Sequence, residues 1–479
     1  MSSSPAWLDW GTAAFSRAAR LDRPVLLLVT TWWAEAGRAL ERTTLSDAAI
    51  IALVDEAFVP VRVDADRRPD IAERYTLEGW PTLVALTPHG QPLGGGTFVD
   101  AGRLGPALRG VADAYRARRD DLLRQSIASP WLSDDGRQAA SAPDGTAWEV
   151  MVDAMAASYD RTYGGFGVAE KRLDAPALLV ALAQLANGEH AGLARAVTHT
   201  LDAVGARLVS QRGGVQRAAG ARDWSAIDRA CLLEVQADAV RVYLEAWSVL
   251  GDDRYRASAL ATVAFARAAL TDAVLGGFFA AELDGEVDRT IDVGANCRMA
   301  RALLHAGTRL DDTRLVEDAV RALERVVPAA YARNAGLAHY LDPQPRVRGL
   351  LADQVAGAAA LLEAYAVTGS AAYADLAEEL VRFALSRLWH AGRGAFVDRV
   401  ATPAGAGDVG WLGVPFEPFA LNCEAASVLA QLGRLTGDAR LHEHALAILR
   451  RFAQRWRAEG LDGACYALAV RDVLLSPEP

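Results

Sequence analysis

Residues 25–41 read VLLLVTTWWAEAGRALE, and this stretch decides how the first part of the chain folds. The apolar run 25–29 is typical of a buried strand, and the Ala-, Glu- and Arg-rich residues at its end are typical of a helix. Two threonines and two tryptophans separate the strand from the helix. A corner of this kind usually presents a reactive side chain, yet the residues from Ala34 to Gly37 include no nucleophile.

The segments on either side of this corner alternate between helix and strand. The helical stretches are 9–22, 46–58, 67–75 and 103–125, and the strand-like ones are 59–66 and 79–98, the last reading as two strands. This alternation predicts an α/β domain over residues 1–118, and its order matches the thioredoxin fold. In that fold a cis-proline faces the corner, and Pro81 in the sequence GWPT is the candidate. The alternative is an ordinary trans proline that begins an edge strand.

Three stretches of this domain resemble a known family. RVDADRRPDIAERY (62–75), GWPTLVALTPHGQPLGGGTF (79–98) and ERTTLSD (41–47) resemble the thioredoxin-like domain of the spermatogenesis-associated protein 20 type. That family typically reads C-H-W-C-H-V-M-E at the corner, and the resemblance places Ala34 and Gly37 where its cysteines stand. A thiolate is the nucleophile of thiol–disulfide exchange, so we expect a redox-inactive domain. Trp32 and Trp33 either fill the surface where a protein partner would dock or pack in the core.

The second half of the chain is rich in regularly interrupted amphipathic helix. It spans residues 146–479 and follows a Ser-, Pro-, Asp- and Gly-rich stretch, 119–145, that reads as a linker. A short glycine-containing element recurs six times, at Gly164, Gly213, Gly276, Gly336, Gly394 and Gly463. A helix–turn–helix pattern repeats between these marks, starting at Tyr243, Leu303, Leu361 and Leu429. Six helical hairpins are enough to close a ring, which predicts an all-α (α/α)6 toroid.

The same family resemblance extends into this half. YDRTYGGFG (159–167), GGFFAAELD (276–284) and TGDARLHEHALAIL (436–449) resemble its six-hairpin, glycosidase-like part. Related toroids bind or process carbohydrates in a funnel lined by the inner helices. The family's HFEKMLYDN segment corresponds to DRACLLEVQ (228–236), and its Trp-Asn-Gly corresponds to residues 295–297, where only Asn296 matches.

Four side-chain amides stand in one register, seven residues before the four strong copies of the helix turn. They are Gln236, Asn296, Gln354 and Asn422. An amide offers both a donor and an acceptor, which suits a polyhydroxylated ligand, so we expect a ligand site here with Trp224 and Lys171 near its mouth. Lys171 is the only lysine of the chain and would anchor an anionic ligand or a carboxylate. Alternatively, the amides tie the inner helices to neighbouring loops, and Lys171 has no special role.

Catalysis by the toroid would require further groups. Glycoside hydrolysis needs two positioned carboxylates, and the candidates are Asp353, Asp228 and Glu282, although such residues more often face solvent or cap helices. No histidine or cysteine spacing indicates a metal site, and we expect no cofactor. Two functions stay open. One is non-catalytic binding of a small, carbohydrate-like ligand, and the other is a toroid enzyme, either a sugar isomerase or epimerase or a glycoside hydrolase.

Composition narrows the class of protein. The net charge of −10 argues against a nucleic-acid partner, which usually meets a basic face. No apolar run approaches the roughly 18 residues that span a bilayer, and the start of the chain does not read as a secretory signal. The four cysteines are widely spaced, so we expect no disulfide framework. These features predict a cytoplasmic protein without a membrane partner.

Overall fold

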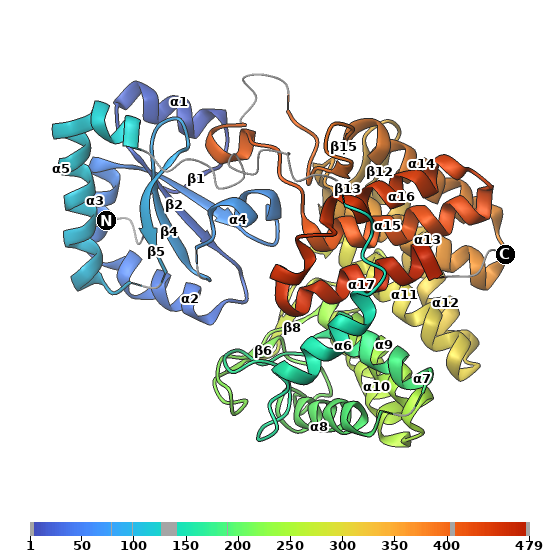
Figure 1. The fold of residues 1–479 in the computed structure, drawn as a ribbon. Coiled ribbons are helices and arrows are strands. Elements are labelled where there is room, and N and C mark those ends of the chain that lie inside the picture. Colours follow the sequence, from blue (N-terminus) through green and yellow to red (C-terminus); the bar gives the residue numbers. More distant parts are fainter. Residues whose placement is uncertain are drawn as a thin grey trace. The chain divides into compact units, whose positions relative to one another are not determined.

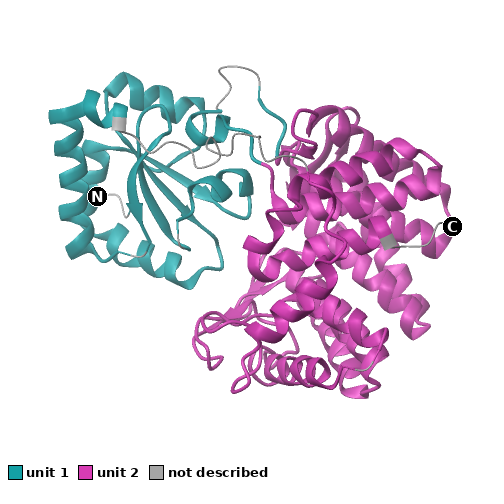
Figure 2. Ribbon diagram, in the orientation of Figure 1, with its two compact units in different colours: residues 1–137, 399–416 teal, residues 138–398, 417–479 magenta. Residues whose placement is uncertain are grey.

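A computed structural model describes the protein over residues 4–77, 79–97, 99–125, 141–188, 190–402 and 408–475. The chain divides into two compact units (Figure 2). Unit 1 contains Met1–Arg137 and Arg399–Phe416, and unit 2 contains Gln138–Asp398 and Glu417–Pro479. The segment Arg399–Phe416 therefore departs from the predicted boundary, which assigned everything after residue 145 to the toroid.

Unit 1 is built on a five-stranded sheet in the order β1-β3-β2-β4-β5 (Figure 1). The strands are β1 (Leu8–Asp9), β2 (Val25–Thr30), β3 (Val59–Asp64), β4 (Thr82–Leu86) and β5 (Pro92–Gly96). β1, β3 and β2 are parallel, whereas β4 is antiparallel to both of its neighbours. Every residue of β2 is buried, because this strand is central and both faces of the sheet are covered. The predicted α/β, thioredoxin-like order is confirmed.

Helices cover the two faces of this sheet. α1 (Thr12–Leu21) and α4 (Pro69–Tyr75) pack on one face, and α2 (Glu35–Arg42), α3 (Ala48–Ala57) and α5 (Ala101–Gln125) pack on the other. α5 has non-helical backbone angles at Arg118, where the sequence predicted the end of the domain. Of the predicted linker, residues 119–125 continue α5 and residues 126–140 lie outside the described residues.

The segment Arg399–Phe416 completes the core of unit 1. The Trp411 ring stacks on Tyr75 at 5.6 Å between centroids, and Leu412 is buried among the residues that line α1 and α4. Gly410 has a φ of +58°, and a Cβ at this position would overlap the carbonyl oxygen of Gly90. Only glycine therefore allows the two backbones to approach so closely.

Unit 2 is a ring of helical pairs (Figure 1). Its inner helices are α7 (Ala175–Ala186), α9 (Leu233–Leu250), α11 (Val293–Leu310), α13 (Leu351–Thr368), α15 (Phe419–Thr436) and α17 (Ala464–Val470). Each inner helix contacts the next, and α17 contacts α7, so the ring of inner helices is closed. The outer helices are α8 (Ala191–Arg207), α10 (Asp253–Phe265), α12 (Thr313–Ala330), α14 (Ala371–Arg387), α16 (Ala439–Phe452) and α6 (Ala147–Ser158). α6 packs against α17 and thereby joins the two ends of the unit, which confirms the (α/α)6 toroid.

The recurring glycine elements connect each outer helix to the next inner helix. Short strands form in these connections: β6 (Ala218–Ala219), β7 (Ile227–Asp228), β8 (Cys231–Leu232), β9 (Ala281–Leu283), β10 (Glu286–Asp288), β11 (Ile291–Asp292), β12 (Tyr331–Ala332), β13 (Gly336–Asp342), β14 (Gln344–Arg348), β15 (Trp389–His390) and β16 (Ala395–Phe396). Short turns make each pair antiparallel, so all inner helices begin at the same end of the ring. Their first turns and the connecting strands meet at this end, hereafter the loop end.

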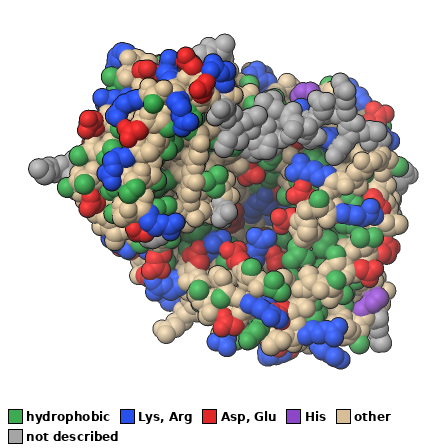
Figure 3. All heavy atoms as spheres, turned by 60° about the vertical axis from the view of Figure 1, so that its left-hand side comes forward, with side chains coloured by type: hydrophobic (Ala, Val, Ile, Leu, Met, Phe, Trp, Pro, Cys, Tyr) green, Lys and Arg blue, Asp and Glu red, His purple; other side chains and the backbone are tan. Residues whose placement is uncertain are grey.

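Acidic and basic side chains are mixed on the surface. On the face drawn in Figure 3, acidic side chains (red) and basic side chains (blue) are intermingled. No helix among the described residues is both long and apolar enough to cross a membrane.

Candidate functional site in the toroid

The four aligned amides clasp the connecting loops. They are almost completely buried, with exposed fractions of 0 to 1%. Asn296 Oδ1 accepts from the Phe278 backbone N–H at 2.7 Å, and Nδ2 donates to the carbonyls of Phe278 and Asp292 at 2.8 and 2.7 Å. The others repeat this clasp: Gln236 holds Val215, Gln354 holds Leu337, and Asn422 holds Phe396.

This geometry corrects the predicted ligand-binding role of the amides. Each amide nitrogen donates one bond to the clasped loop residue and a second to the carbonyl four residues earlier in its own chain segment. An amide has only two N–H donors, so none is left for a ligand. The alternative prediction, that the amides tie the inner helices to neighbouring loops, describes all four.

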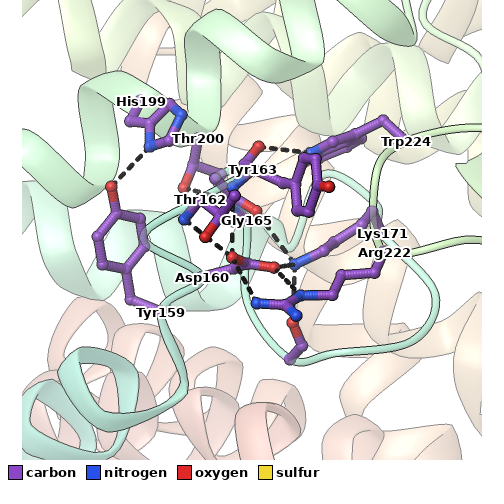
Figure 4. Close-up of polar contacts among 12 residues, drawn as sticks. Tyr159, Asp160, Thr162, Tyr163, Gly165, Lys171, His199, Thr200, Arg222 and Trp224 are labelled. Carbon is purple, nitrogen blue, oxygen red and sulfur yellow. Dashed lines mark hydrogen bonds and ion pairs between the residues drawn. The ribbon is translucent and has the colours of Figure 1, made fainter.

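Lys171 and Trp224 hold the first connecting loop in the same way (Figure 4). Lys171 is 1% exposed, and its Nζ donates to the carbonyls of Gly164 and Gly167 and to Asp160 Oδ2, at 3.1, 2.7 and 3.2 Å. Trp224 Nε1 donates to the Tyr163 carbonyl at 2.8 Å. Lys171 therefore anchors a carboxylate, as one of its predicted roles required, but it is too buried to meet a ligand.

Asp160 is the anionic centre of this loop. It also accepts from Arg222 Nε and Nη2 at 2.7 and 3.2 Å. The Arg222 hydrogen bond, with help from two backbone N–H groups, holds the pKa of Asp160 well below its usual range. A buried carboxylate with two cationic partners stabilises a loop and leaves no proton to transfer.

Two of the three carboxylates proposed for catalysis are engaged in loop ion pairs. Asp228 Oδ2 lies 2.6 Å from Arg217 Nε. Glu282 Oε1 lies 3.1 Å from Arg212 Nη1 and accepts from the Gly285 N–H. Holding these loops together is a sufficient reason for both carboxylates, without a catalytic role.

Asp353 differs, because it forms a buried pair with a histidine. Its Oδ1 lies 3.0 Å from Nδ1 of His339 on β13, and its Oδ2 has no hydrogen-bond partner among the described residues. On the other side, His339 Nε2 is 3.8 Å from Asp292 Oδ2. Burial raises the pKa of Asp292, although the nearby His339 lowers it. An imidazole between two carboxylates can hold a proton and pass it on.

A second set of ionisable side chains lines the interior of the ring, hereafter the lumen. Asp238, Arg298 and Glu424 follow the aligned amides Gln236, Asn296 and Asn422 by two positions. Two residues turn an α-helix by about 200°, so these side chains point away from the clasped loops. Arg298 on α11 pairs with both oxygens of Glu424 on α15, at 3.2 and 2.7 Å. Because α13 lies between these helices in the ring, the pair crosses the lumen.

Other lumen side chains have no such partner. Among the described residues, none forms a hydrogen bond or ion pair with the side chains of Glu234, Asp238 and Arg241 on α9. Burial raises the pKa of Asp238 to about 6 and also raises that of Glu234. Burial and the charge of Arg301 lower the pKa of Arg241 to about 10. The Glu234 side chain is exposed to solvent, yet the surrounding wall of the lumen still raises its pKa through desolvation, as expected for a group inside a concave surface.

The corner between β2 and α2 leaves no space for a side chain at position 37. Ala34 precedes α2, Gly37 lies in its first turn, and both are buried. A Cβ on Gly37 would overlap Thr30 Oγ1. The Trp80–Pro81 bond is cis, as predicted, and the ring of Trp80 meets that of Trp33 edge to face at 5.4 Å.

Trp33 belongs to the core of unit 1 and not to its surface. It is 3% exposed, and its Nε1 donates to Asp66 Oδ2 at 2.7 Å. The core-packing alternative is therefore confirmed for Trp33, whereas Trp32 is half-buried.

Comparison with known proteins supports both halves of the resemblance. Residues 2–129 match Thioredox_DsbH, a family described as "Protein of unknown function, DUF255". Spermatogenesis-associated protein 20 of Mus musculus is 26% identical over 313 residues, and the protein of Homo sapiens is 26% identical over 312. The match with each covers 58% of this chain and 38% of the relative. The chain thus spans well under half of these relatives.

Solved structures resemble the toroid in fold. A D-mannose isomerase has a TM-score of 0.55 at 15% identity, covering 66% of this chain and 88% of that protein. The cellobiose 2-epimerase from Spirochaeta thermophila DSM 6192 has a TM-score of 0.55 at 14% identity, covering 68% of this chain and 97% of that protein. Identities this low establish the six-hairpin fold alone.

The lumen charges are what sequence reasoning missed. The sequence pattern that could have indicated them is the residue two positions after each aligned amide. This residue is ionisable after three of the four amides and is Ala356 after the other. His339 gave no signal, because it comes from a connecting strand and meets Asp353 only through the fold. Among the described residues there is no group of three or more side chains that could hold a metal ion.

Proposed function

We propose that the toroid binds a small, carbohydrate-like ligand in its lumen and that the thioredoxin-like unit carries out no thiol chemistry. The observation that carries the proposal is the row Glu234, Asp238 and Arg241 on α9, which has no ion-pair partner among the described residues. Desolvated, unpaired charges destabilise a fold. Their presence inside a concave surface is typical of a binding site.

The chemistry of the lumen suits a hydroxyl-rich ligand. Carboxylates accept hydrogen bonds and guanidinium groups donate them, so together they match hydroxyl groups, which do both. The similar structures, a D-mannose isomerase and a cellobiose 2-epimerase, point to sugars as a first panel of ligands. The ligand site that we propose is therefore formed by the charged residues on the opposite side of the helices that carry the amides.

Calorimetric titration of the full chain with D-mannose, D-glucose and cellobiose tests this proposal. Arg241→Met should weaken the binding of any sugar that binds the wild type, because it removes the donors of the guanidinium group. The matched control is Arg314→Met, which alters an exposed arginine on outer helix α12. Equal binding by wild type and Arg241→Met would contradict the placement of the ligand.

The redox part of the proposal rests on composition. The first cysteine of the chain is Cys231, so unit 1 contains no thiol. In an insulin-reduction assay with dithiothreitol, the full chain should match the rate without protein. Clear turnover would overturn this part. The four cysteines are unpaired, three of them buried, which supports a cytoplasmic location as part of the proposal.

The His339–Asp353 pair favours a second candidate, a toroid enzyme. A histidine held by a carboxylate suits proton transfer next to a sugar carbonyl, as in an isomerase or epimerase. Hydrolysis is less well supported, because it needs two carboxylates on either side of the bond, and Asp228 and Glu282 are engaged elsewhere. An enzyme of this kind would exchange the sugar's C2 hydrogen for deuterium in D2O, and His339→Gln would stop the exchange. No exchange by wild type would leave binding as the function.

A further inference from the structure

We infer that the ligand of the lumen carries a protonated amine beside its hydroxyl groups, and that Glu234 and Asp238 hold this amine. The inference rests on the proposed function, because it assumes that the lumen is the ligand site. It adds a class of ligand, an amino sugar or a similar polyhydroxylated amine.

The first argument is the charge of the lumen. Its interacting carboxyl groups belong to Glu234, Asp238, Asp292, Asp353, Glu363 and Glu424. The basic groups that act on them are His339 and the guanidinium groups of Arg217, Arg241, Arg298 and Arg301. Six carboxyl groups thus share four guanidinium groups, of which Arg217 already pairs with Asp228 at 2.6 Å. Arg298 is occupied by both oxygens of Glu424, and Arg301 faces Glu363 at 3.8 Å. The acidic groups nearest the loop end therefore outnumber the basic groups that face them.

The second argument is a buried oxygen without a donor. Asp353 is 1% exposed, and its Oδ2 has no partner among the described residues. It belongs to the same acidic end, because His339 lies between Asp353 and Asp292, and the charges of Asp292 and His339 act on Glu234. A buried carboxylate oxygen without a donor is rare, and a nearby cation would offset its charge.

The third argument is spacing. Glu234 and Asp238 are four residues apart on α9, so their side chains stand one above the other, about 5–6 Å apart at Cβ. A primary ammonium group has three N–H donors and can bond to both carboxylates, whereas a hydroxyl donates only one hydrogen bond. The helix dipole explains an acid in the first turn, such as Glu234, but not Asp238 in the second turn.

Arg241 sets the orientation of this ligand. It stands three residues beyond Asp238, on the next turn of α9 and farther from the loop end. An ammonium group would be repelled there, so the amine lies toward the loop end and the hydroxyl groups toward Arg241. A sugar acid would meet the opposite problem at Glu234 and Asp238.

The test is calorimetric titration of the full chain at pH 7.0 with D-glucosamine, N-acetyl-D-glucosamine and D-glucose. Glucosamine should bind at least tenfold more tightly than the two neutral sugars. The double variant Glu234→Gln/Asp238→Asn should lower glucosamine affinity at least tenfold, which corresponds to about 1.4 kcal/mol, and change neutral-sugar affinity less than twofold. Glu317→Gln, an exposed acid on outer helix α12, is the control and should bind like wild type.

The remaining outcomes separate this inference from the proposed function. Equal affinity for all three sugars, lowered by Arg241→Met, would overturn the amine and keep the lumen as the site. No binding by any of the three, or binding that neither lumen variant alters, would overturn both. Melting curves of each variant show that a loss of binding does not come from unfolding.

Discussion

At the scale of single residues, Gly37 stands at a corner where no larger side chain fits. The space that a side chain at position 37 would need holds Thr30 Oγ1, and both residues are buried. Gly37→Ala should therefore destabilise the protein by about 1–3 kcal/mol, the usual effect of overpacking a core. Thr30→Ala removes the obstructing oxygen, so the double variant should recover part of this loss.

Denaturant unfolding of the wild type, the two single variants and the double variant measures this coupling. Additive effects would show that Thr30 is not what opposes a side chain at position 37. The cycle also bears on any attempt to restore cysteines at Ala34 and Gly37. Such a chain would need a smaller residue at position 30 before it could hold a thiol there.

The ionisation of Asp238 makes the stability of the folded chain depend on pH. Burial raises its pKa to about 6, against the charges of Arg298 and Arg241, while Glu234 and Glu424 raise it further. Between about pH 4, where the unfolded group titrates, and pH 6, the folded chain holds a proton that the unfolded chain has released. The stabilisation from this proton is present below that range and is lost as the pH rises through 6.

Asp238→Asn should consequently stabilise the protein at pH 7.5, by about 1 kcal/mol after allowance for partial solvent screening. The gain should shrink as the pH falls and vanish near pH 4. Urea unfolding of wild type and variant across pH 4–8 measures the difference. A variant that is equally less stable at every pH would contradict the desolvation that we assign to Asp238.

At the scale of elements, the unit of construction is the clasp between an inner helix and its connecting loop. Asn296→Leu leaves the N–H and carbonyl of Phe278 without a partner and removes the side-chain bond to the carbonyl of Asp292. Each unsatisfied buried group costs about 1–3 kcal/mol, so we expect a loss of roughly 3–5 kcal/mol in the free energy of unfolding. Asn422→Leu should behave alike, because its clasp on Phe396 is the same.

Melting curves and sugar titrations of these variants distinguish a clasp from a ligand contact. A large fall in melting temperature, with unchanged affinity in the folded fraction, is the expected result. Variants that melt like wild type but bind less would restore the amides as ligand contacts.

The elements also explain what could be predicted from the sequence. The six glycine elements and the four aligned amides recur because the helical hairpins are built in the same way. These repeats therefore predicted the ring. The same repetition suggested a ligand site at the amides, whereas Gln236 and its counterparts recur because they hold the connecting loops. Asp238, Arg298 and Glu424 differ in charge from copy to copy, and a charged residue on a helix reads the same whether it faces solvent or a lumen.

At the scale of the whole molecule, unit 1 includes a segment that follows residue 137 by more than 250 residues in the sequence. The segment Arg399–Phe416 places Leu412 in the core and Trp411 on Tyr75. Arg74, which is 2% exposed, donates to the carbonyls of Trp411 and Val414 at 3.0 and 2.9 Å. No local sequence pattern could have predicted these contacts, because they join positions that only the complete fold brings together.

A fragment of residues 1–137 should therefore be unstable by itself. Without the segment, Arg74 loses two carbonyl partners, and the apolar surface that receives Leu412 and Trp411 meets water. Adding a synthetic peptide of residues 399–416 should raise the melting temperature of the fragment in a concentration-dependent way, as expected when a ligand binds the folded state alone. A peptide with Trp411→Ala and Leu412→Ala is the matched control and should have little effect. A fragment that unfolds cooperatively at the same temperature with and without the peptide would show that the segment packs on unit 1 without stabilising it.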